Sequence, residues 1–551
     1  MKKLILIVFA FSTIFYSFQS KNTTPKKPKL VVGIVIDQMR YDYLTRFAER
    51  YSENGFKRLL NDGFSLENAH YNLIPTYTAV GHASIYTGTT PSEHAIISNY
   101  WYDKFAKESI YCVDDANYKT IGNDSNEGEK SPYRMLTTTV TDQLHLAQNM
   151  HGKTIGISIK DRSSILPAGH TANAAYWFSG GNYGQWISSS FYMEQLPNWV
   201  NKFNASKKVE DYLSTPWETL YEMNTYTQSI ADNNEFEELH NGEKTPTFPH
   251  NIPALRKNNG NYSLIKTIPA GNSITADFAK AAIIGEYLGK SEYTDFLTIS
   301  FSSTDYVGHQ YGPASVEIED TYLRLDNDLA ELFETLDTEV GEGNYTIFLT
   351  ADHAAVHVPA YLQSLKIPAH YFDGTKFKKH LTKITEKYYN STKLIENISN
   401  YQVFLNKKVL DSLGLEQNTV AQKIADEAIS FNGIYKAVTA RTLQTTHFSE
   451  GILNSLQNGY NQKYSGDVML LPYPATLKGY TLSYGRKGTS HGSGYSYDTH
   501  VPILFYGNGI QKGSSSKRYE IVDIAPTIAN LLQIEAPNST SGKVISEVLE
   551  K

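Results

Sequence analysis

Cysteine is almost absent from this sequence, since Cys112 is the only one among 551 residues. A disulfide within the chain is therefore excluded, and so is a lipid-modified cysteine behind the N-terminal segment. An exported protein of this size must then depend on its hydrophobic core, and on bound metal where it has any, for stability. We interpret Cys112 as a packed small residue and not as a nucleophile.

The sequence also lacks an excess of positive charge. The formal net charge is −7 and the pI is near 6.2, whereas a nucleic-acid-binding surface normally shows clustered basic residues. We therefore expect no such surface and small-molecule partners instead. We also expect a monomer.

Long apolar runs are missing after the N-terminus. There, Met1-Lys-Lys precedes a mostly apolar run over residues 4–15 and then small or polar residues up to Ser20. This order is typical of a secretory signal peptide, so we expect residues 1–20 to be removed and 21–551 to be periplasmic or secreted, without a membrane span. An uncleaved anchor is the alternative, because the segment before Ser20 fits the small-x-small cleavage pattern only loosely.

Continuous apolar runs rich in β-branched residues indicate strands buried on both faces of a sheet. Four of them are residues 30–36, 153–158, 296–301 and 345–350. With helical segments between them, they predict an α/β fold with a mostly parallel central sheet flanked by helices. We expect two insertions in this single domain, at about 166–268, where the strand and helix rhythm is lost, and at about 359–446.

Acidic residues and histidines follow these strands directly. Because the carboxyl ends of parallel strands meet at one edge, where open α/β folds bind ligands, we expect these side chains to converge there. Three aspartates and three histidines suit two Zn²⁺ ions, while Mg²⁺ or Ca²⁺ would favour an all-oxygen site. The candidate ligands, the last one from the loop 488–494, are Asp37, Asp305, His309, Asp352, His353 and His491.

The candidate nucleophile is a hydroxyl in the stretch 74–82. Pro75 cannot lie inside a helix or a central strand, and residues 79–86 are small, apolar and helix-compatible. Thr78 is therefore expected at a loop-to-helix junction, where backbone amides and the helix dipole favour an anion. On this stretch alone, a helix N-cap at Thr76 or Thr78 is the favoured reading, and the Asp and His residues elsewhere favour catalysis instead.

Two cations, Lys160 and Arg162, follow the strand 153–158. If the chain stays extended, both project to the same side and suit a doubly charged oxyanion. Two solvated surface cations are the alternative. Other histidines are interpreted as non-ligands. His82, His357 and His500 are expected in the core or behind the site, and the insertion residues are expected on the surface, namely His240, His250 and His380.

Taken in order, these motifs resemble those of the alkaline phosphatase superfamily, specifically the secreted bacterial phosphate-irrepressible alkaline phosphatases of flavobacterial type with a threonine nucleophile. The resemblance covers most of the chain after residue 20. It rests on the strand end at Asp37, Thr-Ala-Val-Gly-His from Thr78, Asn99, Lys-Asp-Arg at 160–162, Asp-Tyr-Val-Gly-His from Asp305, Ala-Asp-His at 351–353 and Thr-Ser-His-Gly-Ser around His491.

The resemblance implies an alkaline-phosphatase-like core and a role for each residue. One zinc would be held by Asp305, His309 and His491. The other would be held by Asp37, Asp352 and His353, together with Thr78 Oγ. Thr78 would attack phosphorus to form a phosphothreonine that water hydrolyses, and Asn99, Lys160 and Arg162 would bind the phosphoryl oxygens.

Formal charges favour a phosphate monoester as the substrate. The charges of two Zn²⁺, three aspartates and an ionised Thr78 cancel, so that Lys160 and Arg162 supply the two positive charges that match a monoester dianion. A nucleotide pyrophosphatase/phosphodiesterase of the same superfamily is the alternative enzyme. A non-catalytic surface protein that binds glycans through its tyrosine-rich insertion is the alternative from another class.

Overall fold

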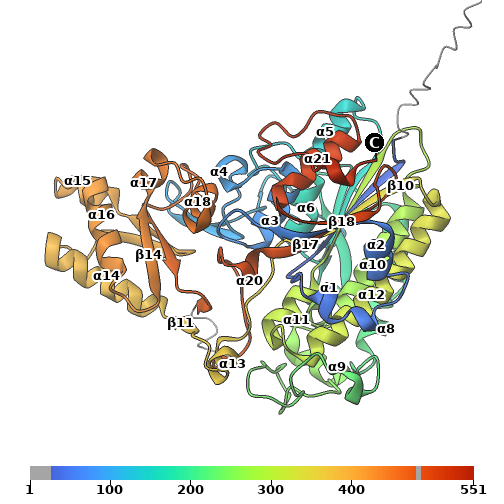
Figure 1. The fold of residues 1–551 in the computed structure, drawn as a ribbon, viewed down its shortest axis with the longest axis horizontal. Coiled ribbons are helices and arrows are strands. Elements are labelled where there is room, and N and C mark those ends of the chain that lie inside the picture. Colours follow the sequence, from blue (N-terminus) through green and yellow to red (C-terminus); the bar gives the residue numbers. More distant parts are fainter. Residues whose placement is uncertain (1–26, 479–484, 551) are drawn as a thin grey trace, which may run out of the picture.

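A ten-stranded sheet forms the centre of the molecule (Figure 1). The computed structural model describes residues 27–478 and 485–550, so the predicted signal peptide lies outside the described residues. In spatial order the strands are β18 (Gly513–Glu520), β2 (Phe64–His70), β17 (His500–Gly507), β10 (Tyr345–Thr350), β1 (Leu30–Ile36), β9 (Asp295–Phe301), β6 (Thr154–Ser158), β7 (Ala174–Ser179), β8 (Gln185–Ser189) and β5 (Thr120–Ile121).

The five strands from β10 to β7 run parallel and form the core of this sheet. Ile34 of β1, for example, pairs with Leu349 on one side and with Ile299 on the other. Every residue of β1, β6, β9 and β10 is buried, as continuous apolar runs require. The predicted α/β fold with a mostly parallel central sheet is confirmed.

Helices cover both faces of the sheet (Figure 1). One face carries α2 (Phe56–Asp62), α10 (Ala270–Gly285) and α12 (Val316–Leu336). The other carries α3 (Thr78–Thr87), α5 (Val140–Ala147), α6 (Asp161–Ala168) and α21 (Ile524–Leu531). Because both faces are covered, the parallel strands stay dry, and only the sheet edge at the strand ends is open to a ligand.

Part of the segment 166–268 belongs to the central sheet. The expected loss of regular strands there is wrong at its start, because β7 and β8 extend the sheet beyond β6. Their residues, Ala-Ala-Tyr-Trp-Phe-Ser and Gln-Trp-Ile-Ser-Ser, mix large aromatic and small polar residues. They therefore lack the aliphatic β-branched runs by which the other strands were predicted.

A second lobe lies beside the main body (Figure 1). It has its own sheet and its own hydrophobic cluster. In spatial order the strands of this sheet are β12 (Ile395–Ser399), β13 (Gln402–Leu405), β15 (Val468–Pro472) and β14 (Ile434–Thr439). The sheet covers α14 (Gly374–Tyr389) and α16 (Gln417–Ala428). Because β15 pairs with β13 and β14, the lobe continues beyond residue 446, where the sequence placed its end.

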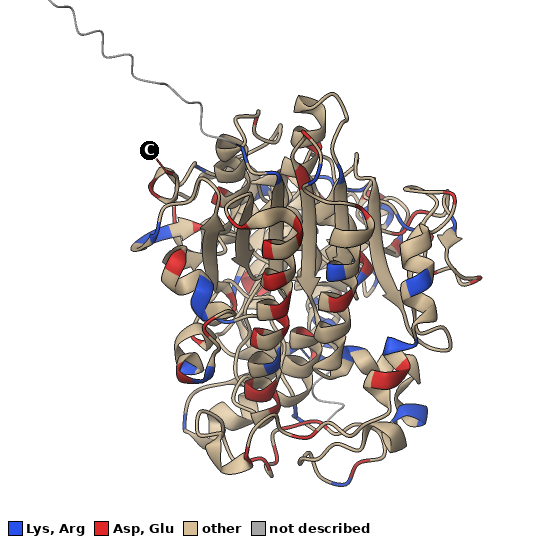
Figure 2. Ribbon diagram, turned by 90° about the vertical axis from the view of Figure 1, so that its right-hand side faces the viewer, with Lys and Arg blue, Asp and Glu red and all other residues tan. Residues whose placement is uncertain are grey.

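Among the residues that the structure describes, no helix has both the length and the apolar character needed to cross a lipid bilayer. In the ribbon of Figure 2, acidic positions recur along the helices that face the viewer, and Lys and Arg positions are scattered among them.

Two histidines predicted on the surface are buried, which corrects that prediction. His240 is 4% exposed and His250 is fully buried. His250 Nδ1 lies 2.7 Å from Glu243 Oε1, and its Nε2 lies 3.3 Å from Glu317 Oε1 on α12. Burial alone would lower the pKa of His250, but these two carboxylates raise it to about 9. Protonated His250 therefore forms ion pairs with Glu243 and with Glu317 on α12. We call this arrangement, which joins residues 243–250 to α12, the clamp.

We predict that this clamp weakens as the pH rises. A folded-state pKa of about 9, above the ordinary value near 6.5, gives a stabilisation that is complete below about pH 6.5 and lost as the pH rises through 9. His250→Gln should therefore lower the melting temperature by a few degrees at pH 6 and by much less at pH 10. His380→Gln is the control, because that ring contacts a backbone carbonyl, a serine hydroxyl and the ring of Phe431 where His250 contacts two carboxylates. An equal effect of His250→Gln at both pH values would contradict the clamp.

Candidate active site and metal centre

Thr78 is the first residue of α3, as predicted, and its side chain is 1% exposed. The chain arrives in an extended conformation at Tyr77 and turns directly into the helix. Asn99 Oδ1 accepts a hydrogen bond from the backbone N–H of Ala79 over 2.8 Å. This bond fixes the side-chain amide of Asn99 so that its oxygen faces the helix and its Nδ2 is left to donate elsewhere.

One group of candidate ligands is formed by Asp305, His309 and His491, whose donor atoms lie within 4.8 Å of one another. Asp305 and His309 are one turn apart on α11 (Ser303–Tyr311). Asp305 Oδ1 is 3.1 Å from His309 Nε2 and 3.6 Å from His491 Nε2. The spacing of four residues therefore brings both α11 side chains to one point, as predicted.

The second group lies beside the first and is fully buried. His353 Nε2 is 3.5 Å from Asp37 Oδ1 and 3.4 Å from Asp352 Oδ2. Asp305 also lies within 4.8 Å of Asp37 and His353. The two groups are therefore one continuous centre, and all six predicted side chains meet in it.

Each of the three histidines in this centre directs Nδ1 at a backbone carbonyl, which leaves Nε2 facing the carboxylates. Such bonding fixes the ring and favours Nε2 as the metal-binding atom. The distances are 2.8 Å from His309 to Thr489 O, 2.7 Å from His491 to Thr76 O and 3.2 Å from His353 to Ala354 O.

The donor set fits a metal ion. Asp37 Oδ1, Asp352 Oδ2 and His353 Nε2 are buried and have no hydrogen-bond partner in the described chain, although buried polar atoms normally have one. Burial and the neighbouring Asp37 raise the pKa of Asp352, while burial lowers the pKa of His353 to about 3. A divalent cation between these atoms would satisfy all three and keep both carboxylates ionised.

Lys160 lies inside this centre. Its Nζ donates to Asp37 Oδ2 over 2.7 Å and to Asp305 Oδ2 over 2.6 Å. Burial opposes the charged form, but these two carboxylates raise the pKa of Lys160. The prediction of an extended chain at 160–162 is wrong, because α6 begins at Asp161. Lys160 and Arg162 nevertheless line one pocket of about 510 Å³.

Arg162 is held by a tyrosine that sequence reasoning missed. Its Nη1 donates to Tyr111 Oη over 3.1 Å, and the Tyr111 hydroxyl donates in turn to Asp161 Oδ1. Tyr111 lies at the end of the hairpin strand β4 (Glu108–Tyr111), which pairs with β3 (Tyr100–Asp103). Nothing in the hairpin sequence marks this tyrosine, because its partner lies 51 residues away.

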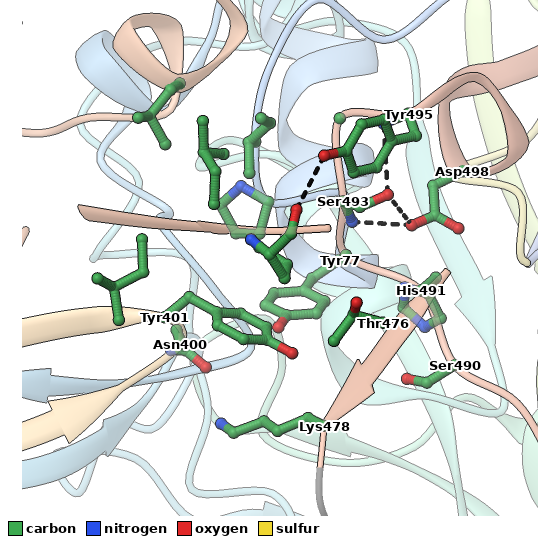
Figure 3. A pocket seen from close by; sticks show the side chains of 18 of the residues that line it. Tyr77, Asn400, Tyr401, Thr476, Lys478, Ser490, His491, Ser493, Tyr495 and Asp498 are labelled. Carbon is green, nitrogen blue, oxygen red and sulfur yellow. Dashed lines mark hydrogen bonds between the residues drawn. The ribbon is translucent and has the colours of Figure 1, made fainter. Parts of the chain in front are cut away.

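A carboxylate behind His491 was also missed. Asp498 is 2% exposed, and its Oδ2 accepts from the backbone N–H and the hydroxyl of Ser493 over 2.8 and 2.6 Å (Figure 3). These bonds fold the loop that carries His491. A pocket of about 100 Å³ separates this loop from the second lobe and is lined by Tyr77, Tyr401 and Tyr495, among others.

The remaining histidines near the centre have other neighbours as well. His82 is fully buried, with Nδ1 2.8 Å from Thr78 O and 3.5 Å from Asp352 Oδ2, and with Nε2 2.9 Å from Ser300 Oγ. His500 stacks on Tyr41, with the ring centroids 4.6 Å apart. His357 packs near Tyr361, with its ring centroid 5.8 Å away. As expected, none of the three belongs to the carboxylate–histidine groups found among the described residues.

The structure has a parallel α/β sheet whose carboxyl edge carries Thr78 at a helix start, beside a centre of carboxylates and histidines. This is the architecture of the alkaline phosphatase superfamily. Residues 31–494 match the profile described as type I phosphodiesterase / nucleotide pyrophosphatase. This chain belongs to that family, with the alkaline phosphatases PafA and PhoV among its relatives.

Alkaline phosphatase PafA of Elizabethkingia meningoseptica is 44% identical over all of this chain and 99% of its own length. Alkaline phosphatase PhoV of Synechococcus elongatus is 46% identical over 96% and 94%. A Myroides odoratus protein named calcium-transporting ATPase is 46% identical over 96% and 95%. The crystal structure of PafA superposes with a TM-score of 0.91 at 43% identity, covering 95% of this chain and 99% of that chain.

We predict that Tyr111→Phe weakens anion binding without removing the fold. The variant keeps the ring but takes away the hydroxyl that holds the guanidinium of Arg162, which then loses orientation. The inhibition constant for inorganic phosphate should rise by about 3- to 10-fold, which corresponds to about one ordinary hydrogen bond, because the variant loses the orientation of the guanidinium and not the guanidinium itself. Tyr102→Phe, on the preceding strand of the same hairpin, is the control. Unchanged phosphate inhibition in Tyr111→Phe would show that Arg162 needs no such support.

Proposed function

We propose that this chain is an alkaline phosphatase that hydrolyses phosphate monoesters and releases inorganic phosphate, using two Zn²⁺ per chain and Thr78 as the nucleophile. The observation that carries the proposal is the meeting of a buried threonine at a helix start, six Asp and His donors and two cations at one sheet edge. The full-length identity to PafA and PhoV supports it.

The metal assignment follows the two groups of donors. Asp305, His309 and His491 would hold one ion. Asp37, Asp352 and His353, with Thr78 Oγ, would hold the other. A mixed set of imidazole nitrogens and carboxylate oxygens suits zinc better than Mg²⁺ or Ca²⁺. When bound, zinc lowers the pKa of a hydroxyl and neutralises charge on the transferred group.

Thr78 then carries the chemistry of the chain itself. The Thr78 hydroxyl would give up its proton to solvent, and its Oγ would form a bond to phosphorus while the ester P–O bond breaks. The leaving alkoxide would take up a proton from solvent and depart as the alcohol. Water hydrolyses the phosphothreonine, which restores Thr78 and releases phosphate. The N–H groups at the start of α3 favour the negative charge on the transferred group.

Three further side chains would hold the phosphoryl oxygens. Asn99 has its amide nitrogen available because Ala79 occupies its oxygen. Arg162 is oriented by Tyr111, and Lys160 is buried next to Asp37 and Asp305. Two cations favour a dianionic monoester over a singly charged diester. The name of the Myroides odoratus relative refers to ATP hydrolysis, and the terminal phosphoryl group of ATP carries similar charge, so ATP belongs among the test substrates.

The remaining assignments are part of the same proposal. Residues 1–20 would be a signal peptide, and 21–551 a single catalytic domain. Its first insertion would begin after β8, and its second, the second lobe, would extend past residue 446 to β15. The mature protein would be a periplasmic or secreted monomer. Its release of phosphate from esters would then take place outside the cytoplasm.

We predict that Thr78→Ala lowers kcat for an aryl phosphate by about 10³-fold or more, because no other hydroxyl takes the place of the nucleophile. The variant should keep the same zinc content as the wild type, measured by elemental analysis, since the Asp and His donors are untouched. Thr78→Ser should keep much more activity. Wild-type protein that contains zinc but turns over no phosphate ester would favour a binding protein and defeat the proposal.

We also predict that removing a cation changes the choice between monoesters and diesters. Lys160→Ala and Arg162→Ala should each lower kcat/KM for an aryl phosphate by at least about 10-fold more than for the matching aryl methyl phosphodiester, because only the monoester presents two charges. Equal losses on both substrates would show the charge argument to be wrong. A wild-type preference for the diester would instead support the phosphodiesterase alternative.

A further inference from the structure

Gln38, directly behind Asp37, contacts a carboxylate from each group of candidate ligands. Its backbone N–H donates to Asp352 Oδ1 over 3.1 Å, and its side-chain Nε2 donates to Asp305 Oδ1 over 2.7 Å. The residue is 3% exposed. Both hydrogen bonds are therefore shielded from water, and each donor bonds a carboxylate that is a candidate metal ligand.

The backbone of Gln38 has an unusual conformation for a side chain of this kind. Its φ is 65°, in the left-handed region that residues other than glycine and asparagine rarely occupy. Such conformations persist where the surroundings enforce them, and they cluster at functional sites. Here the turn after β1 aims the N–H at Asp352 while the side chain reaches back to Asp305.

Space for the amide group is reserved on α11. A Cβ atom at Gly308 would lie 1.9 Å from Gln38 Oε1, so any larger residue there would displace the amide. Gly308 lies between Asp305 and His309 in the sequence, one residue before His309. Helix α11 therefore carries two candidate ligands and also leaves the space in which the Gln38 amide reaches Asp305.

The hydrogen bonds use one oxygen of Asp352 and both oxygens of Asp305. On Asp352, Gln38 takes Oδ1 and leaves Oδ2 without a partner, facing His353 Nε2 at 3.4 Å. On Asp305, Lys160 takes Oδ2, while Oδ1 lies 3.1 Å from His309 Nε2 and receives Gln38. One residue thus orients two carboxylates that belong to different groups.

We propose that Gln38 is a positioning residue that sets the spacing of the two metal-binding groups by holding Asp305 and Asp352 from one point of the chain. The proposal rests on the function proposed above. Hydrogen bonds from such outer partners orient metal ligands, and their loss typically weakens metal binding by about 10- to 100-fold. The side-chain donor acts on the group of Asp305, His309 and His491, and the backbone donor acts on the other group.

The test uses Gln38→Met, which keeps the length of the side chain and the backbone N–H but removes the donor to Asp305. Zinc affinity is measured on the full chain by competition with a chromogenic chelator. We expect one of the two zinc ions to bind about 10- to 100-fold more weakly and the other to bind nearly as in the wild type. Gly308→Ala, which displaces the same amide from the side of α11, should weaken the same ion.

A matched control is available in the second lobe. Gln417 Nε2 also donates to an aspartate, Asp467 Oδ1, so Gln417→Met should leave both zinc affinities unchanged. Melting temperatures of the chelated proteins measure any general loss of stability in the variants. Excess zinc in the assay should restore most of the phosphatase activity of Gln38→Met, whereas it should not restore Thr78→Ala.

The outcomes separate this inference from the proposed function. Wild-type zinc affinity at both sites in Gln38→Met and Gly308→Ala would overturn the positioning role. A weaker affinity for both ions, accompanied by an equal drop in the melting temperature of the chelated protein, would also overturn it, because Gln38 would then act on the fold alone. Wild-type protein that binds fewer than two zinc ions would refute the proposed function instead.

Discussion

Three carboxylates buried at one sheet edge are the constraint on which the rest of this structure depends. Asp37, Asp305 and Asp352 are at most 4% exposed, and like charges held this close without compensation are costly. Lys160 offsets part of this charge. Asp37 Oδ1 and Asp352 Oδ2 have no hydrogen-bond partner among the described residues, and a bound cation would offset the remaining charge. The charge balance around these three carboxylates therefore affects both the stability of the fold and the chemistry of the site.

The sheet and its ligands could be predicted because both leave local signals. Aliphatic runs mark the buried strands, and Asp37 or Asp352 directly after such a run must lie at the carboxyl edge. What could not be predicted depends on distant partners or on where a helix begins. The position of Lys160 is set by the start of α6, and the burial of His250 by Glu317, 67 residues away. Aromatic strands such as β7 carry no aliphatic pattern.

Around the centre, groups outside the six donors fix their orientation. Backbone carbonyls hold the three imidazoles, Asp498 folds the loop of His491, and Tyr111 holds Arg162. Gln38 adds the link between Asp305 and Asp352. Sites of this kind depend on supporting contacts that limit the freedom of each donor before the ligand arrives. Substitutions among these supporting residues should therefore change the orientation of the six donors and their affinity for a metal ion, although the donors themselves stay the same.

His491 reaches the centre only after the chain has returned from the second lobe, and its Nδ1 meets the carbonyl of Thr76, 415 positions earlier. During synthesis from the N-terminus, the residues of β1, β9 and β10 and the aspartates that follow them are therefore made before the last imidazole. Contacts this far apart in sequence form late and slow the search for the native topology. A ribosome-bound or truncated chain ending before this loop would carry the three carboxylates without His491, so the full set of candidate ligands exists only once the chain has been made through this loop.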